Sequence, residues 1–202
     1  TGLRGFSPVE LQHIEICIEG TIMDWAPLCN YTHYSLLKGY SKPYELAEKC
    51  KQNNYKACGI ADYKSISGAV TFFKACKSNG IKPIIGCSFD GFTLFAKSKQ
   101  GWLDLIQIVS SLNEDGELDN SFLVRVCDKG NLLSVAKTEV ASPIKGKDFY
   151  LKTDALMDTY YTNKSEAALH RILLCSKMKT TMPKLSKMMS KGEDFDNREV
   201  FE

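Results

Sequence analysis

The chain has 202 residues, of which 44% are hydrophobic and 25% are charged, so it can bury a sizeable core and falls in the ordinary globular range. Its formal net charge of +2 is too small to indicate nucleic-acid binding by itself, since such binding usually shows as a strongly basic face. Every apolar run is far shorter than the roughly 20 residues that a transmembrane helix requires, and we expect neither a membrane span nor a signal peptide.

The cysteine pattern indicates a reducing compartment. The eight cysteines include no C-x-x-C pair, and several lie inside apolar runs, where a free thiol behaves as a small buried hydrophobe. They occupy positions 17, 29, 50, 58, 76, 87, 127 and 175. Disulfides persist mainly in oxidising compartments, so we expect free thiols and a cytoplasmic protein.

The first 22 residues differ from the rest of the chain. The chain begins at Thr1 and not at methionine, and Met23 would make a plausible native start. We therefore interpret residues 1–22 as an N-terminal extension, or a remnant of expression, that precedes the folded domain.

From residue 41 onward the sequence alternates between helix and strand signals. Residues 41–54 predict a helix that Ser41 opens, with Pro43 in its first turn. Residues 56–62 form a short apolar run of strand length that ends in an acid. This order is typical of repeated helix and strand units.

A second helix and strand come directly after this pair. Residues 67–80 predict a helix capped by Ser67, with Val70, Phe73 and Cys76 or Lys77 at helical spacing, and residues 81–89 predict the next strand. Strand, helix and strand within about 30 residues make a βαβ unit, which implies a right-handed crossover and parallel strands.

The later elements are predicted from the same signals. The expected strands lie at residues 92–98, 130–136 and 148–153, the expected helices at 101–112 and 165–177, and a polar loop at 113–120. In the last helix, Ser165 is the expected cap and Leu169, Ile172 and Leu173 form the expected stripe. After that helix the apolar content falls and charges gather, which predicts a short helix and an exit segment.

Several blocks, in the same order along the chain, carry a family resemblance that periodicity alone could not supply. They include "YSLLKGY", "GIAD", "SGAVTFFKA", "GIKPIIGCSF", "TLFAKS" and "LHRILLCSK". Together they resemble the PHP domain (polymerase and histidinol phosphatase) of bacterial family C replicative DNA polymerases, the DNA polymerase III alpha subunits. The resemblance covers residues 28–182.

This resemblance implies a distorted α/β barrel and a metal site. In active PHP domains, histidines and carboxylates at the C-terminal ends of the strands hold several metal ions that hydrolyse phosphoesters. The chemistry needs neutral imidazole and carboxylate ligands, because the metal ions generate hydroxide and hold the phosphoryl oxygens. The family therefore predicts where ligands should stand in this sequence.

Most of those positions hold residues that bind metal poorly. The positions that can be aligned are Cys29, Tyr31, Asp62, Tyr63, Ser88, Ala136, Asp158 and Tyr160. Three expected histidines are tyrosines, whose neutral phenol, with a pKa of about 10, is a poor ligand and no base at neutral pH. We expect no catalytic residue, no cofactor and no metal cluster, and at most one weak divalent cation such as Mg²⁺ between Asp62 and Asp158.

The other candidates have structural interpretations. We interpret Asp62 as a strand-end acid hydrogen-bonded to one of the three tyrosines above, and Cys29 as a buried or idle thiol. His33 lies two positions after the expected ligand, and we expect it to cap or hydrogen-bond locally. His13 and His170 match no ligand motif. No Ser-His-Asp order, glycine-rich nucleotide loop or H-E-x-x-H helix is present.

The domain is also shorter than the family implies. Active members place a further strand and helix before the last ligand pair, whereas residues 137–157 lead to it almost directly here. We therefore expect an α/β fold, a distorted (β/α)7-like barrel that has lost an element in this region. Residues 23–182 would form the domain and residues 183–202 an exit segment.

Three functions are open at this point. The first is a non-catalytic PHP domain of a bacterial or phage replicative polymerase, a structural module that docks onto the remainder of the polymerase chain and a proofreading exonuclease subunit and meets DNA only indirectly. The second is a divergent metal-dependent phosphoesterase or 3′–5′ exonuclease with a reduced site at Asp62 and Asp158. The third is a stand-alone interaction protein that binds a replisome subunit.

Overall fold

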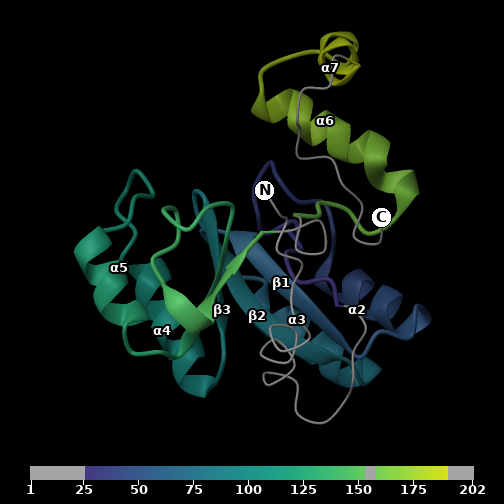
Figure 1. Ribbon diagram of the computed structural model, residues 1–202. Helices are drawn as coiled ribbons and strands as arrows, with labels where there is room; N and C mark the ends of the chain where they lie inside the picture. The colour runs from purple at the N-terminus through teal and green to yellow at the C-terminus, as the bar shows by residue number, and fades with distance from the viewer. Residues whose placement is uncertain (1–25, 153–157, 191–202) are drawn as a thin grey trace, which may run out of the picture.

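The computed structural model describes residues 26–152 and 158–190, apart from the side chain of Lys147 (Figure 1). The helices are α2 (Pro43–Gln52), α3 (Ala69–Asn79), α4 (Lys99–Ser110), α5 (Asn120–Cys127), α6 (Ala167–Lys177) and α7 (Met182–Met189). The strands are β1 (Ala57–Tyr63), β2 (Lys82–Ser88), β3 (Phe92–Ala96), β4 (Leu132–Ala136) and β5 (Phe149–Leu151), with short 3-10 turns η1 (Gly146–Asp148) and η3 (Lys164–Glu166). No helix in these ranges is long and apolar enough to cross a membrane.

The five strands form one mixed sheet in the order β1-β2-β3-β4-β5. β1 and β2 are parallel and are joined through α3, which confirms the predicted βαβ unit. β3 runs antiparallel to both of its neighbours, and β4 and β5 are again parallel. The α/β class expected from the sequence is therefore confirmed.

Backbone from both ends of the domain extends the sheet beyond β1. The segment before β1 runs beside it, since the Gly59 amide donates to the carbonyl of Pro27 at 2.7 Å. Thr159 lies on the far side of that segment, where its amide donates to the carbonyl of Cys29 (3.0 Å) and its carbonyl accepts from the Tyr31 amide (2.9 Å). The chain after β5 thus returns to the chain that precedes β1, and the sheet curls into a distorted barrel.

Apolar side chains fill the inside of this barrel. The interior cluster comprises Leu28, Cys29, Ala61, Phe95, Leu133, Val135 and Tyr150, with Ile84 packed against it. Outside the sheet, Leu46 and Phe72 belong to a core under α2 and α3, while Leu105 and Leu123 belong to one under α4 and α5 (Figure 1). A filled interior leaves room for chemistry only at the ends of the strands.

The cysteines of the described residues are all free thiols, and six of the seven are buried within these cores. Their burial agrees with the expectation that the thiols act as small hydrophobes. Cys17 lies outside the described residues.

Three helix starts differ from the prediction. The N-cap residues of α2 and α3 are Lys42 and Gly68, and neither helix has a side-chain cap, so Ser41 and Ser67 do not serve as caps. α6 comes after the η3 turn, which begins at a capping box between Asn163 and Glu166 and not at Ser165.

The buried stripes of α3 and α6 were predicted wrongly in most positions. α3 buries Cys76, as expected, together with Phe72, whereas Val70 and Phe73 are 57% and 43% exposed. α6 buries His170 and Leu174, and its expected stripe is largely exposed. Both helices carry apolar residues on two adjacent faces, so periodicity alone could not choose the face that packs.

The connection between β4 and Asp158 is short. Among the described residues of this stretch, regular structure is limited to the η1 turn and the three-residue strand β5. The shortened barrel expected around residues 137–157 agrees with this, although residues 153–157 lie outside the described part. Figure 1 shows α6 and α7 beyond this region, apart from the helices that cover the sheet.

Candidate functional site

A polar cavity of about 180 Å³ lies where the parallel strands end. The C-terminal ends of β1, β2, β4 and β5 and the start of β3 surround it, together with the segments around Tyr31 and Tyr160. Its lining is Tyr31, Lys38, Tyr63, Ser88, Phe89, Asp90, Gly91, Phe92, Thr93, Val135, Lys137, Lys152, Asp158 and Tyr160. The structure therefore brings together five of the aligned ligand positions, namely Tyr31, Tyr63, Ser88, Asp158 and Tyr160.

Tyrosines and hydroxyls form one wall of the cavity. The rings of Tyr31 and Tyr160 stack with centroids 5.1 Å apart and an interplanar angle of 5°. The Tyr31 hydroxyl is 2.7 Å from Ser88 Oγ, which lies 2.9 Å from Thr93 Oγ1, and either partner of each hydrogen bond can be the donor. Three of the expected ligand positions thus form a neutral network of rings and hydroxyls.

Three lysines, Lys38, Lys137 and Lys152, also line the cavity. Lys38 Nζ lies 3.8 Å from the centroid of the Tyr63 ring, a cation–π contact. Lys152 forms an ion pair with Asp158 in which the lysine side chain is 10% and the aspartate side chain 21% exposed. Asp158 is therefore neutralised by a cation of the chain itself.

Tyr63 is held at the rim of the cavity by Asp90. Its hydroxyl donates to Asp90 Oδ1 at 2.6 Å, and Lys64 Nζ lies 2.7 Å from Asp90 Oδ2. Burial and this contact raise the pKa of Tyr63 above its ordinary value, while Lys64 and Tyr63 lower the pKa of Asp90. The Tyr63 phenol therefore keeps its proton at neutral pH and offers no anionic oxygen to a metal.

Asp62 lies behind the cavity wall, with four hydrogen bonds to Thr32 and Ser35. Its Oδ1 accepts from the Thr32 amide (2.7 Å), the Thr32 hydroxyl (3.0 Å) and the Ser35 hydroxyl (2.6 Å), and its Oδ2 accepts from the Thr32 hydroxyl at 2.8 Å. The expectation that a tyrosine holds this carboxylate was wrong. Thr32 and Ser35 lie closer because the backbone before β1 pairs with β1 itself.

Burial dominates the electrostatics of Asp62. The side chain is 1% exposed, and this desolvation raises its pKa although the bonds from Ser35 and Thr32 act in the opposite direction. A carboxylate that is enclosed and saturated in this way ties β1 to the preceding loop and is poorly placed to bind a metal ion.

Cys29 and Ala136 lie outside the cavity lining. Cys29 belongs to the interior of the barrel, where burial raises the pKa of its thiol to about 12. A neutral thiol is a poor metal ligand. Ala136 is buried between two residues that do line the cavity, Val135 and Lys137.

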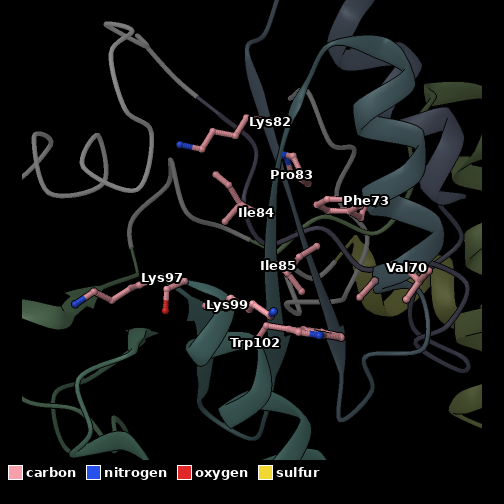
Figure 2. Close-up of a pocket in the computed structure, with 12 residues that line it drawn as sticks. Val70, Phe73, Lys82, Pro83, Ile84, Ile85, Lys97, Lys99 and Trp102 are labelled. Atoms are coloured by element: carbon pink, nitrogen blue, oxygen red, sulfur yellow. The ribbon is translucent and has the colours of Figure 1, made fainter.

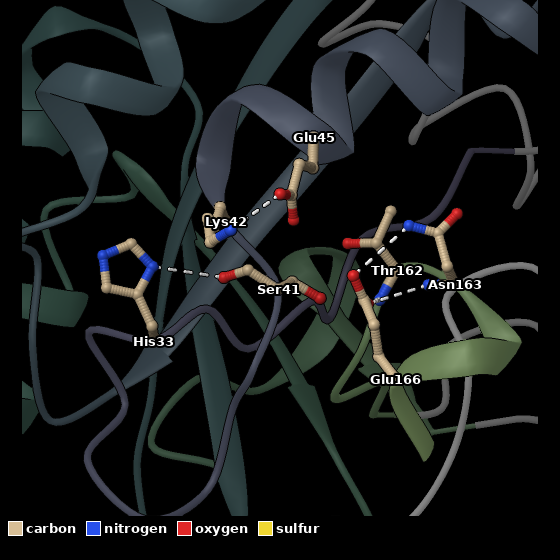
Figure 3. Close-up of polar contacts among 7 residues, drawn as sticks. All are labelled: His33, Ser41, Lys42, Glu45, Thr162, Asn163 and Glu166. Atoms are coloured by element: carbon tan, nitrogen blue, oxygen red, sulfur yellow. Dashed lines mark hydrogen bonds and ion pairs between the residues drawn. The ribbon is translucent and has the colours of Figure 1, made fainter. Parts of the chain in front are cut away.

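The described histidines have local partners. His33 Nδ1 is 3.4 Å from the carbonyl of Ser41 (Figure 3), in agreement with a local hydrogen-bonding role. His170 is fully buried in α6, with its Nε2 2.6 Å from the carbonyl of Lys38 and its ring stacked on Tyr160 at 5.6 Å. His170 therefore positions the loop that carries Lys38. His13 lies outside the described residues.

The start of α6 is fixed by a second polar network (Figure 3). Glu166 Oε2 accepts from the amides of Thr162 (2.9 Å) and Asn163 (3.0 Å), and the Asn163 side chain accepts from Lys49 of α2 at 3.2 Å. These bonds tie the segment between Asp158 and α6 to α2, which fixes Tyr160 in the cavity wall.

A larger, apolar groove lies elsewhere in the described structure. It has a volume of about 580 Å³ and lies between α3 and α4 over β2, where Figure 2 shows Phe73, Ile85 and Trp102. Lys82, Lys97 and Lys99 are the titratable residues of its lining. Its lining contains no acid, histidine or cysteine, which are the usual ligands of a metal ion.

The residues of the cavity do not fit a cluster of metal ions. Within residues 26–152 and 158–190, no group of three or more histidine, cysteine, aspartate or glutamate side chains could hold a metal ion. Asp62 is saturated by hydroxyl and amide donors, and Asp158 is paired with Lys152. A multinuclear site needs several free carboxylates or neutral imidazoles, which this arrangement does not provide.

Asp62→Asn should keep the fold stable, because an amide can accept from the Thr32 amide and the Ser35 hydroxyl and donate to the Thr32 hydroxyl. Asp62→Ala leaves these buried donors without an acceptor and should cost about 2–4 kcal/mol of unfolding free energy. Urea unfolding followed by circular dichroism measures both changes. If Asp62→Asn lost as much unfolding free energy as Asp62→Ala, the hydrogen bonds assigned to Asp62 would be contradicted.

The difference in unfolding free energy between the wild type and Asp62→Asn should depend on pH. Because the pKa of Asp62 is raised in the folded state, the folded chain holds the proton more firmly than the unfolded chain, and ionisation costs stability. The wild type should therefore lose stability relative to Asp62→Asn as the pH rises above about 4, the ordinary pKa of an aspartate. If the wild type instead gained stability relative to Asp62→Asn as the pH rose, the hydrogen bonds from Thr32 and Ser35 would lower the pKa of Asp62 by more than burial raises it.

Comparisons with known proteins agree with the geometry. The model of the PHP domain family matches residues 28–134. The DNA polymerase III subunit alpha of Buchnera aphidicola is 30% identical over 102 residues, which cover 45% of this chain and 9% of that protein. The alpha subunit of Aquifex aeolicus is 46% identical over 63 residues, which cover 31% of this chain and 5% of that protein. That of Bacillus subtilis is 34% identical over 101 residues, covering 45% and 9%.

The chain thus matches less than a tenth of the length of these curated relatives. A solved structure from Bifidobacterium adolescentis, named a "putative metal-dependent phosphoesterase", aligns over 80% of this chain and 86% of its own, with a TM-score of 0.38 and 11% sequence identity. The family match spans more than half of the sequence. This chain belongs to the PHP domain family.

Proposed function

We propose that this chain is a catalytically inactive PHP domain that serves as a structural and partner-docking module of a family C replicative DNA polymerase in the cytoplasm. The similarity to DNA polymerase III alpha subunits of several bacteria supports the polymerase context. The main support for the loss of catalysis is that both acids at the aligned ligand positions are already bound to other side chains or to backbone of this chain. Asp62 is saturated by Thr32 and Ser35, and Asp158 is paired with Lys152.

The chemistry of the remaining positions supports the same proposal. Metal-assisted hydrolysis of a phosphoester requires a positively charged metal to generate hydroxide and to stabilise the phosphoryl oxygens. In this cavity tyrosines and Ser88 occupy ligand positions, and Lys38 and Lys152 bring positive charge that repels a metal ion. The lining contains no histidine, and each of its two carboxylates, Asp90 and Asp158, is paired with a lysine, which weakens it as a general base.

An exposed apolar face on α6 supports a docking role. Leu169 and Ile172 are 46% and 55% exposed on a helix that lies apart from those covering the sheet (Figure 1). The relatives continue far beyond the region that this chain matches. We assign this face to the polymerase part of such a protein, whose contact would bury both side chains.

Hydrolysis assays test the loss of catalysis directly. With a 3′-recessed DNA duplex and a chromogenic phosphodiester as substrates, and with Mg²⁺, Mn²⁺ or Zn²⁺ added, the purified chain should show no turnover that differs between wild type and Asp62→Asn or Asp158→Asn. Metal-dependent turnover that disappears in both variants would establish the rival phosphoesterase or exonuclease with a reduced site.

A pull-down tests the docking face against the polymerase chain of the same genome. Leu169→Glu/Ile172→Glu should weaken the association at least tenfold with no change in circular dichroism, because burying two carboxylates in an apolar contact is unfavourable. The matched control is Val124→Glu/Val140→Glu, which alters two exposed valines outside α6 and should bind as wild type does. Equal effects of the two double variants would remove α6 from the interface.

A further inference from the structure

We propose that the cavity at the strand ends binds a phosphate-type oxyanion directly through Lys38, Lys137 and Lys152, without a metal ion. This inference goes beyond the proposed docking role, which needs no ligand at this place. The three lysines come from the loop before β1 and from the segments after β4 and β5, and they line one cavity.

The cavity carries an excess of positive charge, which attracts anions. Its lining contains the three lysines and two aspartates, Asp90 and Asp158, and each aspartate is paired with a lysine. Since the partner of Asp90 is Lys64 at the rim, four lysines stand against two acids. The partly buried position of Lys152 strengthens its attraction for an anion compared with a lysine in bulk water.

The side chains of Lys38, Lys137 and Lys152 suit an oxyanion chemically. Lysine is a frequent phosphate ligand in proteins, acting as a point charge with three donors.

The hydroxyl network adds donors beside the lysines. In the chain from Tyr31 through Ser88 to Thr93, either atom of each hydrogen bond can donate, so the network can turn an O–H toward an anion. The carboxylates of Asp90 and Asp158 would oppose an anion, but each holds a lysine in place. A tetrahedral oxyanion has several oxygens and can accept from lysines and from hydroxyls of the same cavity.

The volume of the cavity limits the size of the ligand. About 180 Å³ is the space of about six water molecules. That space accommodates a single phosphate group with its five heavy atoms, but not a base and a sugar in addition. A terminal phosphate of a nucleic-acid strand could enter while the rest of the strand stays outside.

Of the four non-glycine residues with positive φ angles in the described ranges, two lie next to cavity residues and two, Asn54 and Lys179, do not. Leu37 and Lys64 adopt positive φ angles of 56° and 50°, a region that is costly for residues with a side chain. Leu37 directly precedes Lys38, and Lys64 comes directly after Tyr63, so both strained residues flank parts of the cavity. Strain of this kind persists where the surrounding structure holds a side chain in a required place.

Isothermal titration calorimetry with inorganic phosphate, in the presence of EDTA and with sodium chloride at matched ionic strength as reference, tests the proposal. Saturable binding should survive EDTA, and Lys38→Glu should weaken it at least tenfold. Lys137→Glu, at an exposed position, should weaken binding without affecting the fold. Lys99→Glu, in the separate apolar groove, is the matched control and should change affinity less than twofold.

A second series identifies the source of the phosphate. A 5′-phosphorylated thymidine oligonucleotide that binds more tightly than inorganic phosphate, and loses affinity in Lys38→Glu, would indicate a strand end, whereas equal affinities would indicate free phosphate. Binding of the unphosphorylated oligonucleotide with equal strength would overturn the proposal. So would the absence of saturable phosphate binding up to roughly 10 mM, or binding that requires metal. None of these results depends on the hydrolysis assay, so this inference and the proposed function can fail separately.

Discussion

The buried carboxylate of Asp62 is the constraint on which the geometry of the cavity depends. At the C-terminal end of β1 it accepts hydrogen bonds from Thr32 and Ser35, and so ties β1 to the loop that carries Tyr31 and Lys38. A carboxylate in an apolar setting is tolerated only when its oxygens are satisfied, so these bonds and the fold require each other. An acid at a position that binds metal in active relatives thereby becomes a structural anchor.

The residues facing the cavity complete this change of role. The stacked Tyr31 and Tyr160 and the hydroxyl of Ser88 fill and hydrogen-bond the space, and Lys152 neutralises Asp158. Good metal ligands are carboxylates, thiolates or neutral imidazoles, whereas a protonated phenol is a weak ligand and a lysine ammonium has no lone pair to offer. The same exchange makes the site attractive to an anion, so the proposed loss of hydrolysis and the proposed phosphate site have one electrostatic cause.

The sequence was informative wherever short-range signals and the family phrases coincide. It predicted the βαβ unit from residues 56–89, and it identified the positions of Tyr31, Tyr63, Ser88, Asp158 and Tyr160, which the fold brings to one cavity. The sequence was misleading where contacts between distant segments of the chain determine the structure. The donors of Asp62 come from backbone that joins β1 only in the folded sheet, and the packed faces of α3 and α6 depend on neighbours that periodicity does not contain. Lys38, which brings positive charge to the cavity, lies outside the aligned ligand positions, so the sequence did not single it out.

Metal content is the most direct test of the central claim that this cavity no longer holds a metal cluster. The chain would be purified without chelator, dialysed against Zn²⁺ and Mn²⁺ and then against metal-free buffer, and analysed by inductively coupled plasma mass spectrometry. The account predicts no stoichiometric transition metal, and the same result for wild type and Asp62→Asn. Two or more ions per chain, lost in Asp62→Asn or Asp158→Asn, would contradict it and restore the phosphoesterase interpretation.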